Sequence, residues 1–228
     1  MPKALALVAC LALLCAPAGA QQAPSKPEVQ TQESQAAMTP AAAIERLKAG
    51  NARFVSNSMK TRDWSAKVMA TASGQYPFAI ILGCMDSRGP IEIVFDQAIG
   101  DLFVLRVAGN VVNSDELGSL EYALHVGTKL IVVMGHTSCG AVKGSLDGVE
   151  LGNLTGLLAQ IHPAVKEAGC TAKDAGCVDK VAEKNVQHSM KEIRARSPYV
   201  AKALDEGKVG MVGAMYDLAT GKVTFLEK

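Results

Sequence analysis

The stretch PFAIILGCMDSR, residues 77–88, joins an uninterrupted apolar run to a thiol, a carboxylate and a guanidinium. The apolar run predicts a buried strand that ends near Cys84. Two similar runs, DLFVLRVAG (residues 101–109) and KLIVVMGH (residues 129–136), predict two more strands. Continuous rather than alternating apolar residues are typical of strands covered on both faces, and therefore of a parallel sheet.

The segments around these runs predict helices and a final hairpin. SDELGSLEYALHVGT (residues 114–128), with Ser114 as the expected N-cap and acids in its first turn, forms a strand–helix–strand crossover. Further helices are expected in residues 39–55, where Thr39 would be the cap, and in 151–168 and 178–196. The C-terminal stretch KVGMVGAMYDLATGKVTFLE reads as two strands joined at Thr220-Gly221. The expected fold is α/β: a short, mostly parallel sheet flanked by helices, with an antiparallel edge strand and a C-terminal hairpin.

The N-terminal residues predict export. MPKALALVACLALLCAPAGA, residues 1–20, has an early charge, an apolar stretch and a small-residue cleavage site, as a signal peptide does. The product would be periplasmic or secreted; anchoring of a lipoprotein through Cys10 is the alternative. Residues 21–38 are polar and contain prolines, which predicts a disordered linker. Residues 39–228 are then expected to form one domain.

Charge excludes some partners. The full sequence has 23 basic and 22 acidic residues. Lys3 is the one charged residue in residues 1–20, so the rest of the chain has 22 of each. A neutral chain has no electrostatic footprint for nucleic acid or an anionic membrane. The apolar N-terminal stretch is also shorter than the roughly 20 residues of a membrane span.

Two of the six cysteines are candidates for a disulfide. Cys170 and Cys177 lie in GCTAKDAGC, a loop-like segment. An exported chain meets an oxidising compartment, which favours a bond between them. Two free thiols are the alternative.

A second set of side chains predicts a metal site. Cys84 follows the first strand, and His136 and Cys139 follow the third. Ligand sites in open α/β sheets gather beyond the carboxyl ends of strands. Thiolate and imidazole are the ligands that tetrahedral zinc prefers. The fourth position would belong either to Asp86 or to water.

Arg88 decides between these two possibilities. Its guanidinium, two residues beyond Asp86, can bind the carboxylate bidentately and keep it off the metal. With the pair intact the site is open, and with the pair broken Asp86 can become the fourth ligand and close it.

These motifs resemble those of the β-class carbonic anhydrases. CMDSR matches a Cys-x-Asp-x-Arg motif, HTSC matches a His-x-x-Cys motif, and GDLFVLRVAGNVV is also similar. The resemblance implies one Zn²⁺ per chain on Cys84, His136 and Cys139, with Asp86 and Arg88 as the catalytic pair. It implies reversible hydration of carbon dioxide to bicarbonate and a proton by zinc-bound hydroxide, in a homodimer or homotetramer. Gln97 approximately matches a substrate-binding glutamine of the family.

Other functions remain open from the sequence. A similar site could hydrolyse a carbon dioxide analogue such as carbon disulfide. A bicarbonate sensor with Asp86 as a permanent zinc ligand is a non-enzymatic alternative. Some family members inhibit themselves with bicarbonate through a tryptophan, but Ile81 stands at that position, so Arg106 is expected to bind backbone carbonyls instead.

Overall fold

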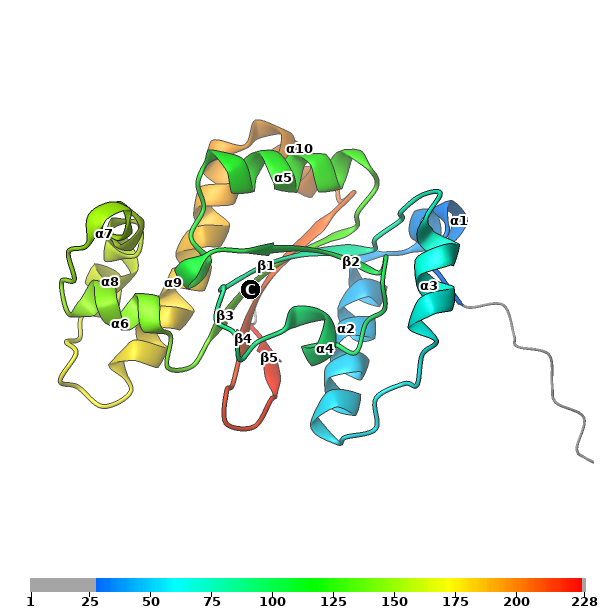
Figure 1. The fold of residues 1–228 in the computed structure, drawn as a ribbon. Helices are drawn as coiled ribbons and strands as arrows, with labels where there is room; N and C mark the ends of the chain where they lie inside the picture. The colour runs from blue at the N-terminus through cyan, green and yellow to red at the C-terminus, as the bar shows by residue number, and fades with distance from the viewer. Residues whose placement is uncertain (1–27, 227–228) are drawn as a thin grey trace, which may run out of the picture.

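The computed structural model describes residues 28–226 and centres on a five-stranded sheet of order β2-β1-β3-β4-β5 (Figure 1). The strands are β1 (Ala79–Gly83), β2 (Leu102–Arg106), β3 (Leu130–His136), β4 (Gly210–Tyr216) and β5 (Val223–Phe225). The first four strands run parallel, and β5 pairs antiparallel to β4 at the edge. The predicted fold class and the C-terminal hairpin are therefore confirmed, whereas the predicted signal peptide lies outside the described residues.

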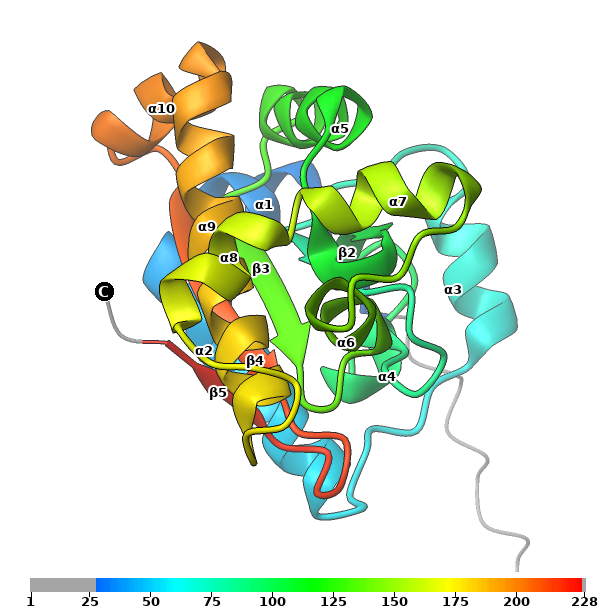
Figure 2. The same ribbon diagram turned by 90° about the vertical axis from the view of Figure 1, so that its left-hand side faces the viewer.

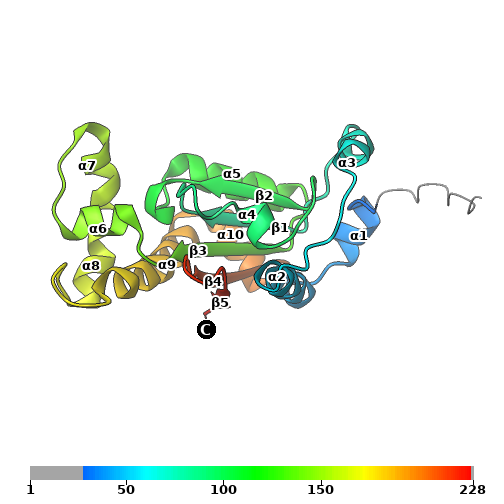
Figure 3. The same ribbon diagram turned by 60° about the horizontal axis from the view of Figure 1, so that its bottom comes forward.

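Helices cover both faces of the sheet (Figures 1 and 3). Alternate side chains of β1 and β3 pack on one face against α2 (Pro40–Val55) and α4 (Ile91–Val94). The other face packs against α5 (Ser114–His125), α9 (Cys177–Arg196) and α10 (Pro198–Asp205). All residues of β1 and β3 are buried, which explains their continuous apolar runs.

Three short helices form a separate layer at one end of the sheet. They are α6 (Gly140–Leu146), α7 (Gly152–Ala159) and α8 (His162–Ala168), which pack against the first half of α9. The predicted single helical stretch over 151–168 is divided between α7 and α8. Pro163 is tolerated in the first turn of α8 but could not continue a helix from α7, because its ring removes a hydrogen bond.

The predicted N-cap residue is confirmed for α2 and wrong for α5. Thr39 caps α2 as predicted, and its side chain accepts a hydrogen bond from the Ala42 amide. The cap of α5 is Asn113 rather than Ser114. Asn113 has extended backbone angles and accepts from the amides of the first turn, while the Glu116 side chain accepts from the Asn113 amide. This reciprocal pair fixes the start of the crossover helix that leads into β3.

The predicted disordered linker is wrong over residues 28–38. This segment contains α1 (Gln32–Ala37), which begins with a capping box between Thr31 and Ser34. Gln35 is buried, and its side-chain amide donates to the Pro77 carbonyl at 2.9 Å. The polar composition that suggested disorder instead supplies a cap and a buried hydrogen bond beside β1. A last short helix, α3 (Trp64–Thr71), lies near α1 (Figure 3).

None of the helices in residues 28–226 is long and apolar enough to span a membrane.

The structure joins Cys170 and Cys177 in a disulfide, with a Cα–Cα distance of 5.9 Å. Replacing the pair by Cys170→Ser and Cys177→Ala should lower the free energy of unfolding by about 2–3 kcal/mol, because the bond closes a short loop in the unfolded chain. Alanine is chosen at 177 because that side chain is buried. Urea unfolding with and without reductant tests this: reductant should shift the wild-type midpoint and leave the double variant unchanged. An equal midpoint for oxidised wild type and variant would contradict it.

Candidate metal centre

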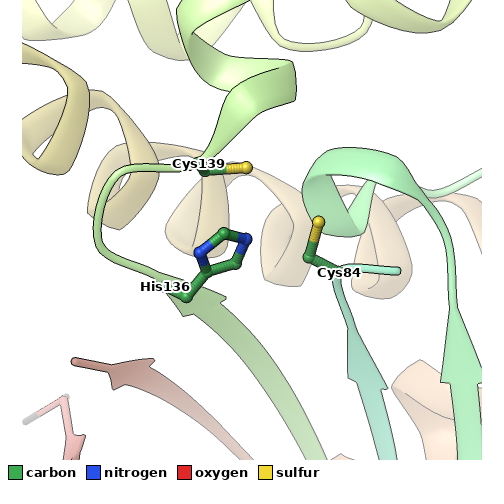
Figure 4. Close-up of side chains that lie close together, drawn as sticks. All are labelled: Cys84, His136 and Cys139. Atoms are coloured by element: carbon green, nitrogen blue, oxygen red, sulfur yellow. The ribbon is translucent and has the colours of Figure 1, made fainter. Parts of the chain in front are cut away.

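Three potential metal ligands meet beyond the carboxyl ends of the central strands of the sheet (Figure 4). Cys84 follows the last residue of β1, His136 is the last residue of β3, and Cys139 is the N-cap of α6. Because β1 and β3 are parallel neighbours, their carboxyl ends lie together. The three ligand atoms lie within 4.8 Å of one another. The structure therefore brings together the three side chains that the sequence proposed as zinc ligands.

The histidine is oriented as a ligand. His136 Nδ1 lies 2.9 Å from the Thr137 carbonyl oxygen, which can only accept, so Nδ1 carries the proton. His136 Nε2 is buried and has no hydrogen-bond partner among the described residues. A buried nitrogen left with a free lone pair is costly unless something binds it. A metal bound by Nε2 and by the two cysteine sulfurs would satisfy this nitrogen. The contact of Nδ1 with the Thr137 carbonyl is the usual outer hydrogen bond of a ligating imidazole.

The two thiols also suit a metal. The neighbouring Cys139 thiol and His136 imidazole, together with a hydrogen bond from the Gly109 amide, lower the pKa of Cys84 to about 4, against the opposing effect of burial. The lowered pKa favours the thiolate of Cys84, the form that binds zinc. The same contact with Cys84, together with burial, raises the pKa of Cys139. Cys139 would release its proton on binding a cation. Both are free cysteines and are not joined to each other. This donor set, two sulfurs and one nitrogen, fits zinc.

Asp86 is held by Arg88. Arg88 Nε donates to Asp86 Oδ1 at 2.9 Å and Nη2 donates to Oδ2 at 2.7 Å, and the Arg88 amide also donates to Oδ1 at 3.0 Å. These bonds keep the pKa of Asp86 well below its usual range. The carboxylate remains close to the ligands, with Oδ2 3.9 Å from His136 Nε2. It is therefore ionised, fixed in direction and able only to accept hydrogen bonds at this distance.

Arg106, at the end of β2, supports the loop that carries Cys84 and Asp86. Its Nε donates to the Cys84 carbonyl at 3.0 Å and its Nη2 donates to the Asp86 carbonyl. The expected role of Arg106 in binding backbone carbonyls is confirmed. Ile81 is fully buried in the core on the α2 side of the sheet. Tyr216 lines the same pocket as Asp86, and its hydroxyl donates to the Arg88 carbonyl at 3.4 Å.

Gln97 lies elsewhere in the chain. It is buried, accepts a hydrogen bond from Arg46 Nε at 3.0 Å and donates to the Phe95 carbonyl at 2.6 Å. It lines a separate hollow beside α2 and α3. Within one chain, Gln97 therefore does not lie with the three ligands, because its side chain is turned toward Arg46.

A small pocket lies beside the ligands. Cys84, Asp86 and His136 line it together with Gly89, Met134, Gly135 and Tyr216. The carboxylate and the ligands occupy its polar part, and the glycines and methionine make the rest small and apolar. Such a pocket suits a small substrate without charge.

Comparison with known proteins identifies the family. The family model described as carbonic anhydrase matches residues 79–223, which include every residue of the metal centre. A carbonic anhydrase of Mycolicibacterium smegmatis is 39% identical over 189 residues, covering 81% of this chain and 92% of the relative. The chain belongs to the carbonic anhydrase family. Its enzymes use zinc to hydrate carbon dioxide, and the metal centre described above is the corresponding site in this carbonic anhydrase.

Solved structures assign the carbonic anhydrase fold to the β class. A β-carbonic anhydrase of Coccomyxa in complex with acetazolamide is similar with a TM-score of 0.65 and 31% identity, covering 72% of this chain and 78% of that one. One of two tetrameric β-carbonic anhydrases of Sordaria macrospora gives a TM-score of 0.63 and 27% identity, covering 72% of this chain and 91% of that one. The predicted family, enzyme class and zinc requirement are confirmed.

The sequence did not reveal every contact around the ligands. The Gly109 amide donates to Cys84 Sγ at 3.3 Å, and the Ser138 amide donates to Asp179 Oδ1 at 2.6 Å. Gly109 stood in a quoted motif, and its positive φ of 68° could have been suspected from a glycine at the end of a strand. Asp179 is 40 residues beyond Cys139 and gave no local signal.

Proposed function

We propose that this chain catalyses the reversible hydration of carbon dioxide with zinc held by Cys84, His136 and Cys139, and with Asp86 kept away from the metal by Arg88. One observation carries the proposal: the three ligand atoms lie within 4.8 Å of one another beside a carboxylate that Arg88 binds through two hydrogen bonds. An aspartate that acted as a permanent fourth ligand would need no such partner.

When bound, zinc supplies a Lewis acid that lowers the pKa of water and so provides a strong nucleophile near neutral pH. The protein residues would do the rest. Asp86, ionised and fixed by Arg88, accepts a hydrogen bond from the attacking group and so orients its lone pair. Arg88 also neutralises the carboxylate, which would otherwise be drawn toward the metal. The apolar part of the pocket, formed by Gly89, Met134 and Gly135, would receive the uncharged substrate.

The enzyme is further proposed to be exported and oligomeric. The signal-like residues 1–20 support export, and a disulfide between Cys170 and Cys177 is consistent with an oxidising compartment. The periplasm or the extracellular medium would be its location, with attachment through Cys10 as the alternative. The tetrameric relatives from Sordaria macrospora support assembly as a homodimer or homotetramer. The balanced charge of the mature chain gives no support to a nucleic-acid partner.

Metal removal tests the function directly. Protein purified with zinc should contain one zinc per chain and accelerate carbon dioxide hydration in a stopped-flow pH-indicator assay. Dialysis against a chelator should abolish the acceleration, and added zinc should restore it, since the nucleophile depends on the metal. Full zinc occupancy without turnover, even at alkaline pH, would contradict the proposal and favour a sensor. Analytical ultracentrifugation of the same sample would determine the oligomeric state.

A further inference from the structure

Helix α9 contacts the strand that ends in one metal ligand and a turn that touches another. It packs against β3, which ends in His136 (Figure 2), and against η1 (Ala108–Asn110), the turn that follows β2 and whose Gly109 amide donates to Cys84 Sγ. Most of the side chains that α9 buries are small or apolar, as the packing of a helix on a sheet requires. Two polar side chains on α9, Asn185 and Asp179, form hydrogen bonds to the backbone beside the ligands.

Asn185 reaches the Cys84 side of the site. Its side chain is 1% exposed, and Nδ2 donates to the Gly109 carbonyl at 2.6 Å. The Gly109 amide in turn donates to Cys84 Sγ at 3.3 Å. The Asn185 Oδ1 atom is buried without a hydrogen-bond partner in residues 28–226. A buried amide that leaves its oxygen unpaired is costly, so its donor contact with Gly109 is the feature that offsets this cost.

Gly109 has little free space around its Cα atom. Its φ is +68°, and an added Cβ would lie 2.7 Å from Ile161 Cδ1 and 3.2 Å from Ala141 Cβ. The residue is therefore packed against α6 and the start of α8, and Asn185 holds its carbonyl. With the carbonyl fixed, the amide of the same residue is aimed at the Cys84 sulfur.

Asp179 reaches the segment that carries His136 and Cys139. Its Oδ1 accepts from the Ser138 amide at 2.6 Å. Ser138 lies between the ligands His136 and Cys139 and has a φ of +53°, a conformation that costs energy for a residue with a side chain. The hydrogen bond from the Ser138 amide to Asp179 stabilises this turn, which sets the spacing of the imidazole and the second sulfur.

We infer that Asn185 and Asp179 are positioning residues of the zinc site: Asn185 acts through the turn that donates to the Cys84 sulfur, and Asp179 acts on the segment that carries His136 and Cys139. The inference rests on the proposed zinc function. An N–H···S hydrogen bond stabilises the thiolate and reduces its electron donation to the metal, and outer partners of this kind orient and tune metal ligands. Helix α9 thereby sets both the geometry of the site and the donor strength of Cys84, although none of its residues is a ligand.

Ser189 provides the matched control. It is 2% exposed, also lies on α9, and donates from Oγ to the Asn110 carbonyl at 3.0 Å. Its contact is a buried hydrogen bond to the same turn, one residue away from Gly109, but it does not lead to a ligand atom. If the contacts of α9 matter only for packing, Ser189→Ala and Asn185→Ala should affect the zinc site equally.

The experiment compares wild type, Asn185→Ala, Asp179→Ala, Asp179→Asn and Ser189→Ala. Zinc affinity is measured by competition with a chromophoric chelator, and the sulfur-to-metal charge-transfer band is recorded after loading with Co²⁺. Asn185→Ala should bind zinc about 10- to 100-fold more weakly and shift the band, because the hydrogen bond to Cys84 is no longer fixed. Asp179→Ala should also weaken binding, whereas Asp179→Asn, which keeps an acceptor oxygen, should retain most of it. Ser189→Ala should match wild type in both measurements.

Three results would overturn the inference: wild-type affinity and band in Asn185→Ala, wild-type affinity in Asp179→Ala, or an equal loss in Ser189→Ala. Asp179 is partly exposed, so its variants test the inference even if Asn185→Ala does not fold. Failure of the proposed function gives a different result, since wild type itself would then either take up no zinc at Cys84, His136 and Cys139 or hold zinc without hydrating carbon dioxide.

Discussion

Cys139→Ser is expected to abolish both zinc binding and turnover. Serine keeps the shape of the side chain but its hydroxyl is not a thiolate, so the site would retain one sulfur and one nitrogen ligand. Because loss of even an outer partner costs about 10- to 100-fold in affinity, loss of a ligand should cost more than about a hundredfold. Without the metal, kcat/KM should fall by about a thousandfold or more, toward the uncatalysed rate. Elemental analysis and stopped-flow hydration measure the two losses.

The control separates loss of a ligand from damage to the fold. Cys139 is 1% exposed and lies among apolar side chains of α6 and α8, so the variant also buries a hydroxyl. Cys84→Ser, at a site that is only partly buried, should lose zinc in the same way with less effect on folding. The double replacement of Cys170 and Cys177 should keep its zinc. A Cys84→Ser protein with one tightly bound zinc and normal turnover would show that the ligand assignment is wrong.

Asp86→Asn is expected to keep zinc and lose most of its turnover, by about 10²- to 10³-fold in kcat. The asparagine amide would present an N–H donor where the carboxylate only accepts, and it would not retain the charged pair with Arg88. The ligand atoms themselves would be unchanged. The zinc content of Asp86→Asn should therefore stay at the wild-type level while its kcat falls, whereas the cysteine variants should lose both zinc and activity.

Arg88→Ala tests the other half of the pair. Without the guanidinium, Asp86 loses the two side-chain hydrogen bonds that hold it, and its Oδ2 atom is already 3.9 Å from His136 Nε2. We expect the carboxylate to become the fourth ligand, so that turnover falls while zinc is retained. X-ray absorption at the zinc edge should then report two sulfur, one nitrogen and one carboxylate oxygen ligand. Full activity of both Asp86→Asn and Arg88→Ala would refute the assigned roles.

Much of the fold could be predicted because the buried strands are continuous in sequence. β1 and β3 are covered on both faces, so their apolar runs could be recognised without any knowledge of what covers them. The ligands followed from the same argument, since Cys84 and His136 lie at the ends of these strands. Helix α1 could not be predicted from composition, because its order depends on the contact of Gln35 with Pro77, which is distant in sequence.

The supporting contacts of the site could not be predicted for the same reason. Asn185 lies 76 residues from Gly109, and Asp179 lies 41 residues from Ser138. The sequence predicted a helix over residues 178–196, but not which backbone groups its side chains would meet. The position of Gln97, in the loop after α4, likewise depends on Arg46 of α2. Only the packed chain reveals such pairs.

The bond between Cys170 and Cys177 affects how recombinant material should be made. A host cytosol keeps thiols reduced, so protein produced there would have two free thiols, with two more hydrogen atoms than the oxidised form. The loop before α9 would then not be cross-linked. Material directed through a secretory route would be oxidised. Batches of the same sequence from the two hosts would then differ in shelf life, and intact-mass measurement before any assay would tell them apart.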